Sequence, residues 1–377
     1  MSAELRFGPG LVAAARALDT PCLVLDQDLL LRAYRALRSA LPGAELFYAM
    51  KANPHDAVVA PLAADGCGFE VASTAELELA ARHGVPPERI ISSNSVKTID
   101  LLRRARALGV DRFAFDSEDE LQKIGRFAPG ARVYCRVVVD NSGSDWPLSR
   151  KFGVPAGDAV PMLLDAAALG LRPHGLSFHV GSQCRDVASW RRAIETCAAI
   201  WQDAARAGLR LEALNLGGGF PVRHLRETPS WNAIGTEIGA AVAELLPPGV
   251  RLVVEPGRAI VGGAAVLVTS VIGKARRGDE RWIYLDAGVF NGLMEAVGGL
   301  GYELRTERDG PTSRQVVAGP TCDSMDVIAT EVELPELEVG DRVYVMNAGA
   351  YTLSYASRFN GFAPPELHLL PGVALPR

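Results

Sequence analysis

Short β-forming runs alternate with Ala-, Leu- and Arg-rich stretches of helical periodicity over the first two-thirds of the 377-residue chain. The stretches 74–83 and 187–207 are examples of such amphipathic helices. A helix between two strands forces those strands to pair in parallel, because the helix carries the chain back across the sheet. Eight such units in about 235 residues fit a closed (β/α)8 barrel. The expected strands are 46–50, 69–72, 90–92, 112–115, 133–139, 175–180, 213–216 and 252–255.

The pattern changes after residue 264, where β runs separated by Gly and Pro replace the alternation. Little helical periodicity remains there, which predicts a separate all-β region. The run 22–25 precedes the first barrel unit, and we expect it to add a strand to that region. We therefore predict an α/β chain with a (β/α)8 TIM barrel at 27–263 and an all-β domain formed by 1–26 and 264–377. The later β runs are 266–272, 281–285, 315–318, 327–334 and 343–346.

Charge and cysteine usage exclude several classes of protein. The net charge is −5 and the charges are interspersed, which argues against nucleic acid or an anionic membrane as a partner. The six cysteines lie far apart, so neither a disulfide framework nor a metal site is expected. No apolar run approaches the ~20 residues of a membrane-spanning helix. The first residues lack a basic-then-apolar leader pattern, and we expect a protein of the reducing cytoplasm.

Ionisable residues gather where the predicted barrel strands end, which is where the active sites of such barrels lie. Lys51 directly follows an apolar strand, and a desolvated lysine there offers a nucleophilic amine. Taken alone, a surface lysine is the commoner interpretation. His179 lies on the expected strand 175–180, which is otherwise apolar at its end, and a single histidine in such a place is more often a packed core residue than a catalyst.

Two anion-suited elements follow the seventh and eighth strands. The glycines at 217–219 let backbone N–H groups approach an anion, although a plain tight turn fits them equally well. Arg258 would add a charged fork to the same anion. Glu255 could pair with a protonated ring nitrogen, or form an internal ion pair with an arginine.

The all-β region contains an unusually polar loop at 318–326. A thiol beside carboxylates, Cys322 next to Asp323, fits a proton donor combined with a cation-binding site. Tyr351 ends another β run. Its phenol could bond a phosphate, or it could cap the core of the β domain.

Six motifs, in this order along the chain, resemble those of the fold-type III pyridoxal 5′-phosphate (PLP) decarboxylases, the ornithine and diaminopimelate decarboxylase group. The match runs from about residue 20 to residue 362. Each motif alone is weak, but six in family order are specific. They are YAMKANP at 48–54, HVGSQ at 179–183, GGGFP at 217–221, EPGR at 255–258, CDSMD at 322–326 and GAY at 349–351.

The resemblance implies an alanine-racemase-like architecture with PLP as cofactor. Lys51 would hold the cofactor covalently, His179 would stack on the pyridine ring, and Glu255 would pair with the ring nitrogen. Cys322 would return a proton to the substrate Cα, and Asp323 would bind the distal amine. In this family the residues matching these last two come from the partner subunit, which implies a head-to-tail homodimer with shared active sites. The residues expected to hold the phosphate are Ser182, Gly218, Gly219, Arg258 and Tyr351.

The same resemblance favours L-ornithine, converted to putrescine, as the substrate, with lysine next. Asp323 follows the cysteine as in ornithine decarboxylases, whereas diaminopimelate decarboxylases usually carry Glu there. The segment 290–297 lies where the family places its specificity segment, and Glu295 would face the distal amine. Ala296 and Val297 replace polar residues of the bacterial ornithine and lysine enzymes. Diaminopimelate or an amino acid of specialised metabolism therefore stays open. Glu70 stands where many relatives have Asp.

Two other interpretations compete with a decarboxylase. An enzyme of the alanine racemase type shares the barrel and the cofactor, but it usually places Arg at the ring nitrogen, so Glu255 argues against it. A regulator of polyamine synthesis built on an inactive decarboxylase would lose cofactor residues. Lys51, Glu255 and Cys322 are all present here.

Overall fold

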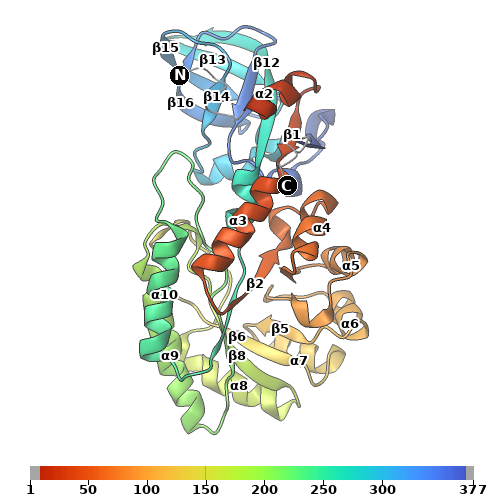
Figure 1. Cartoon of the computed structure of the whole chain (residues 1–377), viewed down its shortest axis with the longest axis vertical. Coiled ribbons are helices and arrows are strands. Elements are labelled where there is room, and N and C mark those ends of the chain that lie inside the picture. The colour runs from red at the N-terminus through yellow and green to blue at the C-terminus, as the bar shows by residue number, and fades with distance from the viewer. Residues whose placement is uncertain (1–8, 149, 371–377) are drawn as a thin grey trace, which may run out of the picture. The chain divides into compact units, whose positions relative to one another are not determined.

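The computed structural model describes residues 9–148 and 150–370, and they form two compact units (Figure 1). One unit comprises 34–221 and 228–259, and the other comprises 1–33, 222–227 and 260–377. The two ends of the predicted β domain, residues 1–8 and 371–377, lie outside the described residues, as does Ser149. The predicted limits of the barrel domain, 27–263, stay a prediction.

The first unit contains eight parallel strands in the order β4-β3-β2-β11-β10-β8-β6-β5. A single bridge between Ser92 and Phe113 joins the two end strands, with hydrogen bonds on either side of it. The Ser92 N–H donates to Arg112 O (3.0 Å), and the Ala114 N–H donates to Ser92 O (2.9 Å). The predicted barrel is therefore confirmed. Its strands are β2 Ala44–Ala49, β3 Gly68–Glu70, β4 Ile90–Ile91, β5 Arg112–Phe115, β6 Arg132–Arg136, β8 Arg172–Ser177, β10 Ala213–Asn215 and β11 Arg251–Val254.

Helices follow the barrel strands and lie outside them (Figure 1). Several begin at a hydroxyl residue that accepts a backbone N–H, as Ser73, Ser117 and Ser230 do. The helices are α3 Gln27–Ala40, α4 Asp56–Ala64, α5 Thr74–Arg82, α6 Ile99–Ala107, α7 Glu118–Phe127, α8 Ala159–Ala168, α9 Ala188–Arg206, α10 Trp231–Leu245 and α11 Arg258–Val261. Short helical turns are η1 Met50–Ala52, η2 Pro87–Arg89, η3 Ala156–Asp158 and η4 Gly262–Ala264.

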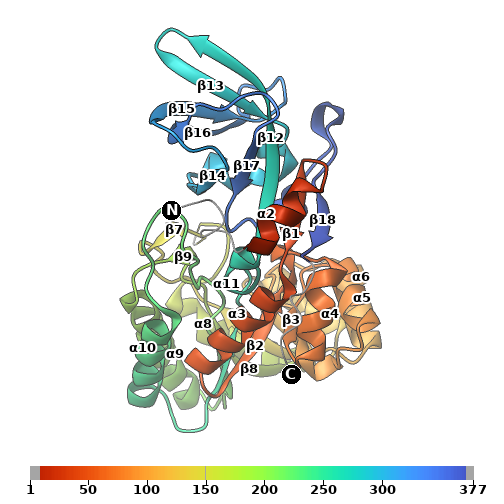
Figure 2. The same cartoon turned by 45° about the horizontal axis from the view of Figure 1, so that its top comes forward.

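The second unit is built on a sheet in the order β14-β17-β12-β13-β15-β16, in which β1 also pairs with β12. β1 is antiparallel to β12 and parallel to β18, so the first and last strands of the described residues lie side by side (Figure 2). The all-β prediction for this region is confirmed. The strands are β1 Cys22–Leu25, β12 Ala265–Arg277, β13 Glu280–Leu285, β14 Leu304–Thr306, β15 Thr312–Ala318, β16 Val327–Pro335, β17 Arg342–Val345 and β18 Glu366–Leu369. Its helical segments are α2 Pro9–Arg16, η5 Val289–Leu293, η6 Met294–Gly298, α12 Thr352–Tyr355 and η7 Phe359–Gly361.

Four short strands were not predicted from the sequence. They are β14, β18 and the antiparallel pair β7 Ser144–Trp146 and β9 Ser182–Cys184. Their sequences, SDW, SQC, LRT and ELHL, contain no continuous apolar run of the kind that identified the predicted short strands.

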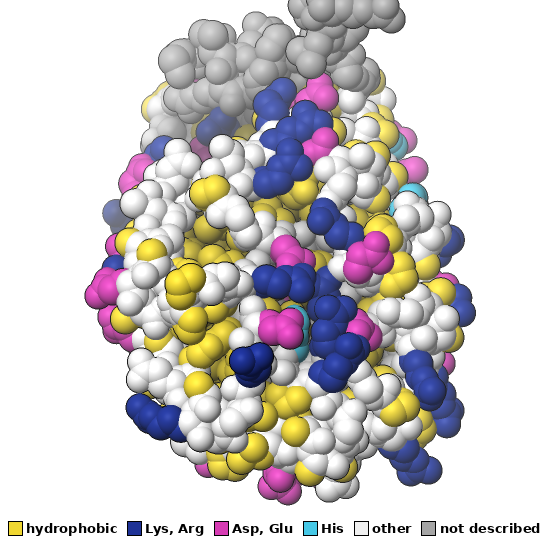
Figure 3. Space-filling view, turned by 60° about the horizontal axis from the view of Figure 1, so that its bottom comes forward, with side chains coloured by type: hydrophobic (Ala, Val, Ile, Leu, Met, Phe, Trp, Pro, Cys, Tyr) yellow, Lys and Arg dark blue, Asp and Glu magenta, His cyan; other side chains and the backbone are white. Residues whose placement is uncertain are grey.

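Charged side chains form a network where the barrel strands begin. The buried Arg112 lies 3.4 Å from Glu45, whose carboxylate also accepts from Arg251 (2.6 Å). Asp111 pairs with Arg132 at 2.5 Å. Basic and acidic side chains likewise intermingle on the face drawn in Figure 3. The strand starts of such barrels contribute to stability rather than to chemistry, and we assign this network that role.

Candidate active site

Predicted site residues of the barrel lie just beyond the carboxyl ends of its strands. Lys51 occupies the turn η1 directly after β2. Met50 and Ala52 on either side of it are buried, whereas 49% of the Lys51 side chain is exposed. The backbone is therefore fixed while the amine remains accessible.

The Lys51 amine contacts a buried carboxylate at the end of β3. Its Nζ lies 2.7 Å from Oε2 of Glu70, a residue that is only 1% exposed. The other carboxylate oxygen, Oε1, has no hydrogen-bond partner among the described residues. A buried acceptor without a partner costs free energy unless a ligand or water satisfies it. This oxygen therefore marks a place where a polar group is expected to bind.

Glu255, at the end of β11, is buried and hydrogen-bonded to two other strand ends. Its Oε1 accepts from Asn215 Nδ2 (2.5 Å) and from the Ser93 hydroxyl. Burial raises the pKa of Glu255, and the charge of Glu70 raises it further. A positively charged partner would reverse this and favour the carboxylate. The site is thus suited to a cationic ring nitrogen.

His179 follows β8 and is electrically neutral at ordinary pH. Burial and the nearby charges of Arg136 and Lys51 lower the pKa of His179 to about 3. Its Nδ1 accepts the Gly181 N–H at 3.0 Å, so the single ring proton lies on Nε2. A neutral imidazole of fixed orientation is suited to stacking on a heteroaromatic ring.

The predicted phosphate loop needs its glycines because the backbone turns tightly against neighbouring chain. Gly217 and Gly219 have positive φ values of 64° and 99°. A Cβ on Gly218 would lie 2.8 Å from the carbonyl oxygen of Glu255, and one on Gly219 would lie 2.6 Å from that of Gly181. Only glycine fits this turn, whose backbone conformation is of the kind that binds anions.

The remaining predicted phosphate ligands of the barrel are Arg258 and Ser182. Arg258 begins α11, three residues after Glu255, and is 6% exposed. Ser182 begins β9, and the next residue but one, Cys184, donates its N–H to Gly219 O (2.9 Å). The β9 strand is therefore tied to the glycine loop.

In the β unit, the loop that carries Cys322 is held by side-chain bonds. The Cys322 N–H and Sγ approach Asn360 Oδ1 at 3.1 and 3.2 Å. Asp323 Oδ1 accepts the Met325 N–H (2.8 Å). The buried Asp326 accepts from Val289 N (2.7 Å), so the loop is joined to the chain ahead of the specificity segment.

Tyr351 and Glu295, the other predicted site residues of this unit, lie in constrained positions. Tyr351 has φ 63°, a left-handed conformation that is rare for a bulky residue and concentrates at functional sites. Its ring stacks on Tyr355, with the centroids 5.7 Å apart. Glu295 lies in η6 and is 5% exposed, whereas the neighbouring Val297 is 53% exposed.

Sequence reasoning did not assign roles to Ser93, Asn215 or Asn360. Ser93 directly follows the expected strand 90–92, but nothing local in the sequence connects it to Glu255. Asn215 is the last residue of the apolar strand β10, and a polar amide at that place in the sequence is a signal that could have identified it. Asn360 is 38 residues from Cys322, and only the fold brings them together.

The residues of the barrel rim fit PLP. The backbone at 217–219 has positive φ at Gly217 and Gly219, a turn of the kind whose N–H groups bind anions. Glu70 Oε1 is a buried acceptor that a polar group of a ligand could satisfy, and it lies beside the Lys51 amine, which can condense with an aldehyde. Lys51 would hold the cofactor, Glu255 its ring nitrogen and His179 its face.

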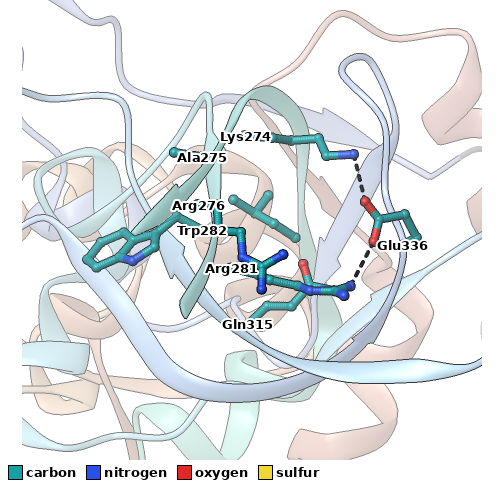
Figure 4. A pocket seen from close by; sticks show the side chains of 8 residues that line it. Lys274, Ala275, Arg276, Arg281, Trp282, Gln315 and Glu336 are labelled. Atoms are coloured by element: carbon teal, nitrogen blue, oxygen red, sulfur yellow. Dashed lines mark hydrogen bonds and ion pairs between the residues drawn. The ribbon is translucent and has the colours of Figure 1, made fainter. Parts of the chain in front are cut away.

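A separate pocket of about 430 Å³ lies in the β unit and contains none of these residues (Figure 4). Two of its three basic side chains share one carboxylate, because Glu336 joins Lys274 (2.9 Å) and Arg281 (3.1 Å). Among the described residues, no group of three or more His, Cys, Asp or Glu is placed to hold a metal ion. No helix within 9–148 and 150–370 has the length and apolar character needed to cross a membrane.

The chain is similar to known proteins over most of its length. The family model described as "Pyridoxal-dependent decarboxylase, pyridoxal binding domain" matches residues 27–262. The lysine/ornithine decarboxylase of Selenomonas ruminantium is 36% identical, over 92% of this chain and 89% of its own. Antizyme inhibitor 2 of Xenopus laevis is 35% identical, over 94% and 81%. The crystal structure of lysine/ornithine decarboxylase from Vibrio vulnificus complexed with putrescine superposes with a TM-score of 0.88, at 36% identity, covering 96% and 97%.

The fold and the rim together define a (β/α)8 enzyme that uses PLP. The chain belongs to the pyridoxal-dependent decarboxylase family, and it acts as a PLP-dependent decarboxylase of basic amino acids. The predicted family, cofactor and enzyme class are confirmed.

Proposed function

We propose that this enzyme decarboxylates L-ornithine to putrescine, with lysine as its second substrate. The proposal rests on Asp323, which directly follows Cys322 and whose loop is fixed by the Met325 N–H. Glu295 supplies a second carboxylate in the same unit. Two carboxylates suit the distal ammonium of a basic amino acid, since charge-assisted hydrogen bonds are the strong ones. The relatives named lysine/ornithine decarboxylase support the same pair of substrates.

The residues of the chain divide the work around the cofactor, which supplies the electron sink for loss of CO2 when bound. Lys51 would anchor it, with Glu70 available to accept the proton that the amine must lose. Glu255 would keep a proton on the ring nitrogen, so it should affect the rate of CO2 loss more than binding. Cys322 would deliver the proton that replaces the carboxylate on Cα.

A substrate panel tests the proposal. CO2 release is measured from ornithine, lysine, diaminopimelate, arginine and acidic amino acids at equal concentrations. We expect the highest kcat/KM with ornithine, then lysine, and Asp323→Asn should raise KM for both because it removes the charge that binds the distal ammonium. Preferential release from diaminopimelate or an acidic amino acid would overturn the choice of substrate.

The similarity to antizyme inhibitor 2 keeps an inactive regulator as the second candidate. The two differ in a spectroscopic signature that needs no substrate. With PLP added, the enzyme should absorb near ~420 nm, and borohydride should abolish the band and leave the cofactor covalently attached. Lys51→Ala is the control. A wild-type chain that behaves like this variant would support the regulator.

We further propose a head-to-tail homodimer in which Cys322 and Asp323 serve the partner's barrel. Lys51→Ala and Asp323→Ala, each nearly inactive at low substrate concentration, are mixed after partial unfolding and refolded. Random pairing leaves one intact site in each mixed dimer, which should restore about a quarter of the wild-type activity. No restoration, with mixed dimers present, would contradict shared sites.

A further inference from the structure

Cys322 has a specific hydrogen-bond acceptor in its own chain, and that acceptor belongs to a segment with no assigned role. Oδ1 of Asn360 accepts the Cys322 backbone N–H (3.1 Å) and lies 3.2 Å from Sγ. The backbone donor identifies the amide orientation, because only an oxygen can face an N–H. The same oxygen therefore sets both the backbone and the side chain of the cysteine.

The backbone at Asn360 is adapted to this contact. Asn360 has φ 55° and the following Gly361 has φ 82°, so two successive residues adopt the left-handed region. Asparagine is among the few residues other than glycine that tolerate this region. The turn η7 thus points the Asn360 side chain at a residue 38 positions earlier in the sequence.

The turn that carries Asn360 is anchored to the start of the specificity segment. The Ser357 N–H and hydroxyl both donate to Phe290 O, at 2.8 and 3.1 Å. The rings of Phe290 and Phe359 pack with their centroids 4.6 Å apart. On the other side, Asp326 holds the cysteine loop through Thr321 N (3.0 Å). The thiol is therefore fixed from two directions.

We propose that Asn360 is a positioning residue that holds the Cys322 thiol in the orientation from which it protonates the substrate Cα. This rests on the proposed role of Cys322. In the normal step, CO2 leaves, the Sγ–H proton passes to Cα, and solvent returns a proton to the sulfur. If the thiol is misplaced, water would protonate the cofactor carbon bonded to the substrate nitrogen instead, and the C=N double bond would then join that nitrogen to Cα. Hydrolysis of this Cα=N bond by one further water would leave the nitrogen on the cofactor as pyridoxamine 5′-phosphate and release Cα as part of an amino aldehyde.

The thiol itself provides a readout that does not depend on activity. Cys322 is exposed, whereas the other five cysteines are buried. Burial raises the pKa of Cys22 to about 11 and that of Cys67 to about 12, so these thiols react slowly. Alkylation of the full chain by iodoacetamide, followed by mass spectrometry, therefore reports on Cys322.

Two variants separate the hydrogen bond from the backbone conformation. Asn360→Gly keeps the left-handed turn and removes the acceptor, so Cys322 should be alkylated about three- to tenfold faster, as expected for the loss of one modest hydrogen bond. Asn360→Asp keeps the acceptor and adds a negative charge, which disfavours the thiolate and should slow alkylation. Asn347→Gly is the matched control, because Asn347 has φ 56° and bonds Arg223 O instead.

The second measurement is the product partition on the cofactor-loaded enzyme. Asn360→Gly should raise the share of turnovers that end in pyridoxamine 5′-phosphate and aldehyde by several-fold, while Asn347→Gly leaves it unchanged. An unchanged alkylation rate would overturn the contact, and an unchanged partition would overturn the positioning role. If no amino acid releases CO2, the proposed function fails, while the alkylation rates still decide whether Asn360 holds the thiol.

Discussion

Substituting alanine for Gly219 tests whether the glycine loop is the phosphate cradle. An alanine at φ 99° is strained, at a cost of about 1–2 kcal/mol. Its Cβ would also lie 2.6 Å from Gly181 O and 2.8 Å from Val180 Cγ2. Relieving this overpacking costs a further ~1–3 kcal/mol. We therefore expect Gly219→Ala to lower the free energy of unfolding of the cofactor-free chain by about 2–5 kcal/mol.

Gly208→Ala is the matched control, since Gly208 has φ 84° but no atom within 4 Å of its Cβ position. It should lose only the ~1–2 kcal/mol of backbone strain. Urea unfolding measures both variants, and titration of the absorbance near ~420 nm measures PLP binding. Displacing the loop removes a hydrogen bond to a charged phosphate, about 1.5–3 kcal/mol, so PLP should bind Gly219→Ala roughly 10- to 100-fold more weakly. Wild-type PLP affinity in that variant, together with the expected loss of stability, would refute the cradle.

Three further predictions concern buried charge. Burial raises the pKa of Glu255 in the folded chain, so the stability that Glu255 contributes is lost as pH rises. Glu255→Gln should therefore stabilise the cofactor-free chain at neutral pH, while kcat falls strongly. A variant that keeps its kcat would contradict the role of Glu255 at the ring nitrogen. Burial lowers the pKa of His174 to about 4, so up to about 3 kcal/mol of the free energy of unfolding should be lost as pH falls from about 6.5 to about 4. In urea titrations at several pH values, His174→Asn should show a weaker dependence of stability on pH over this range. Lys97→Met should lower the free energy of unfolding by about 3 kcal/mol, because it leaves Glu120 buried with fewer partners. Adding Glu120→Gln should recover part of that stability. Unchanged stability of the Lys97→Met variant would contradict a stabilising role for this ion pair.

The barrel could be predicted from the sequence because long-range pairing was encoded locally. Each strand is followed by a helix, and this alone requires parallel neighbours. The rule that chemistry lies at strand ends then led to Lys51, His179 and Glu255 without knowledge of their partners. Their roles remain predictions, but their positions beyond β2, β8 and β11 follow from the fold.

What the sequence did not reveal depends on contacts between residues far apart in the chain. Ser93 and Glu255 are separated by 162 positions, and no local pattern connects them. The same holds for the acceptor that Asn360 offers to Cys322. The single bridge at Ser92 that completes the barrel is too short to leave a hydrophobic pattern. The order of the motifs along the chain predicts such contacts only when the residues that lie together are already known in other members of the family.

The position of β1 has a consequence for how the chain is made. Its residues 22–25 leave the ribosome before every barrel strand, yet one of their two neighbours, β18, comprises residues 366–369. The barrel strands are synthesised in between and can assemble before the sheet has its last member. During synthesis, β1 therefore lacks its β18 neighbour while the barrel unit forms. A gene fragment starting at β12 would encode a sheet without this interior strand, so truncation there should yield aggregation-prone protein rather than an independent domain.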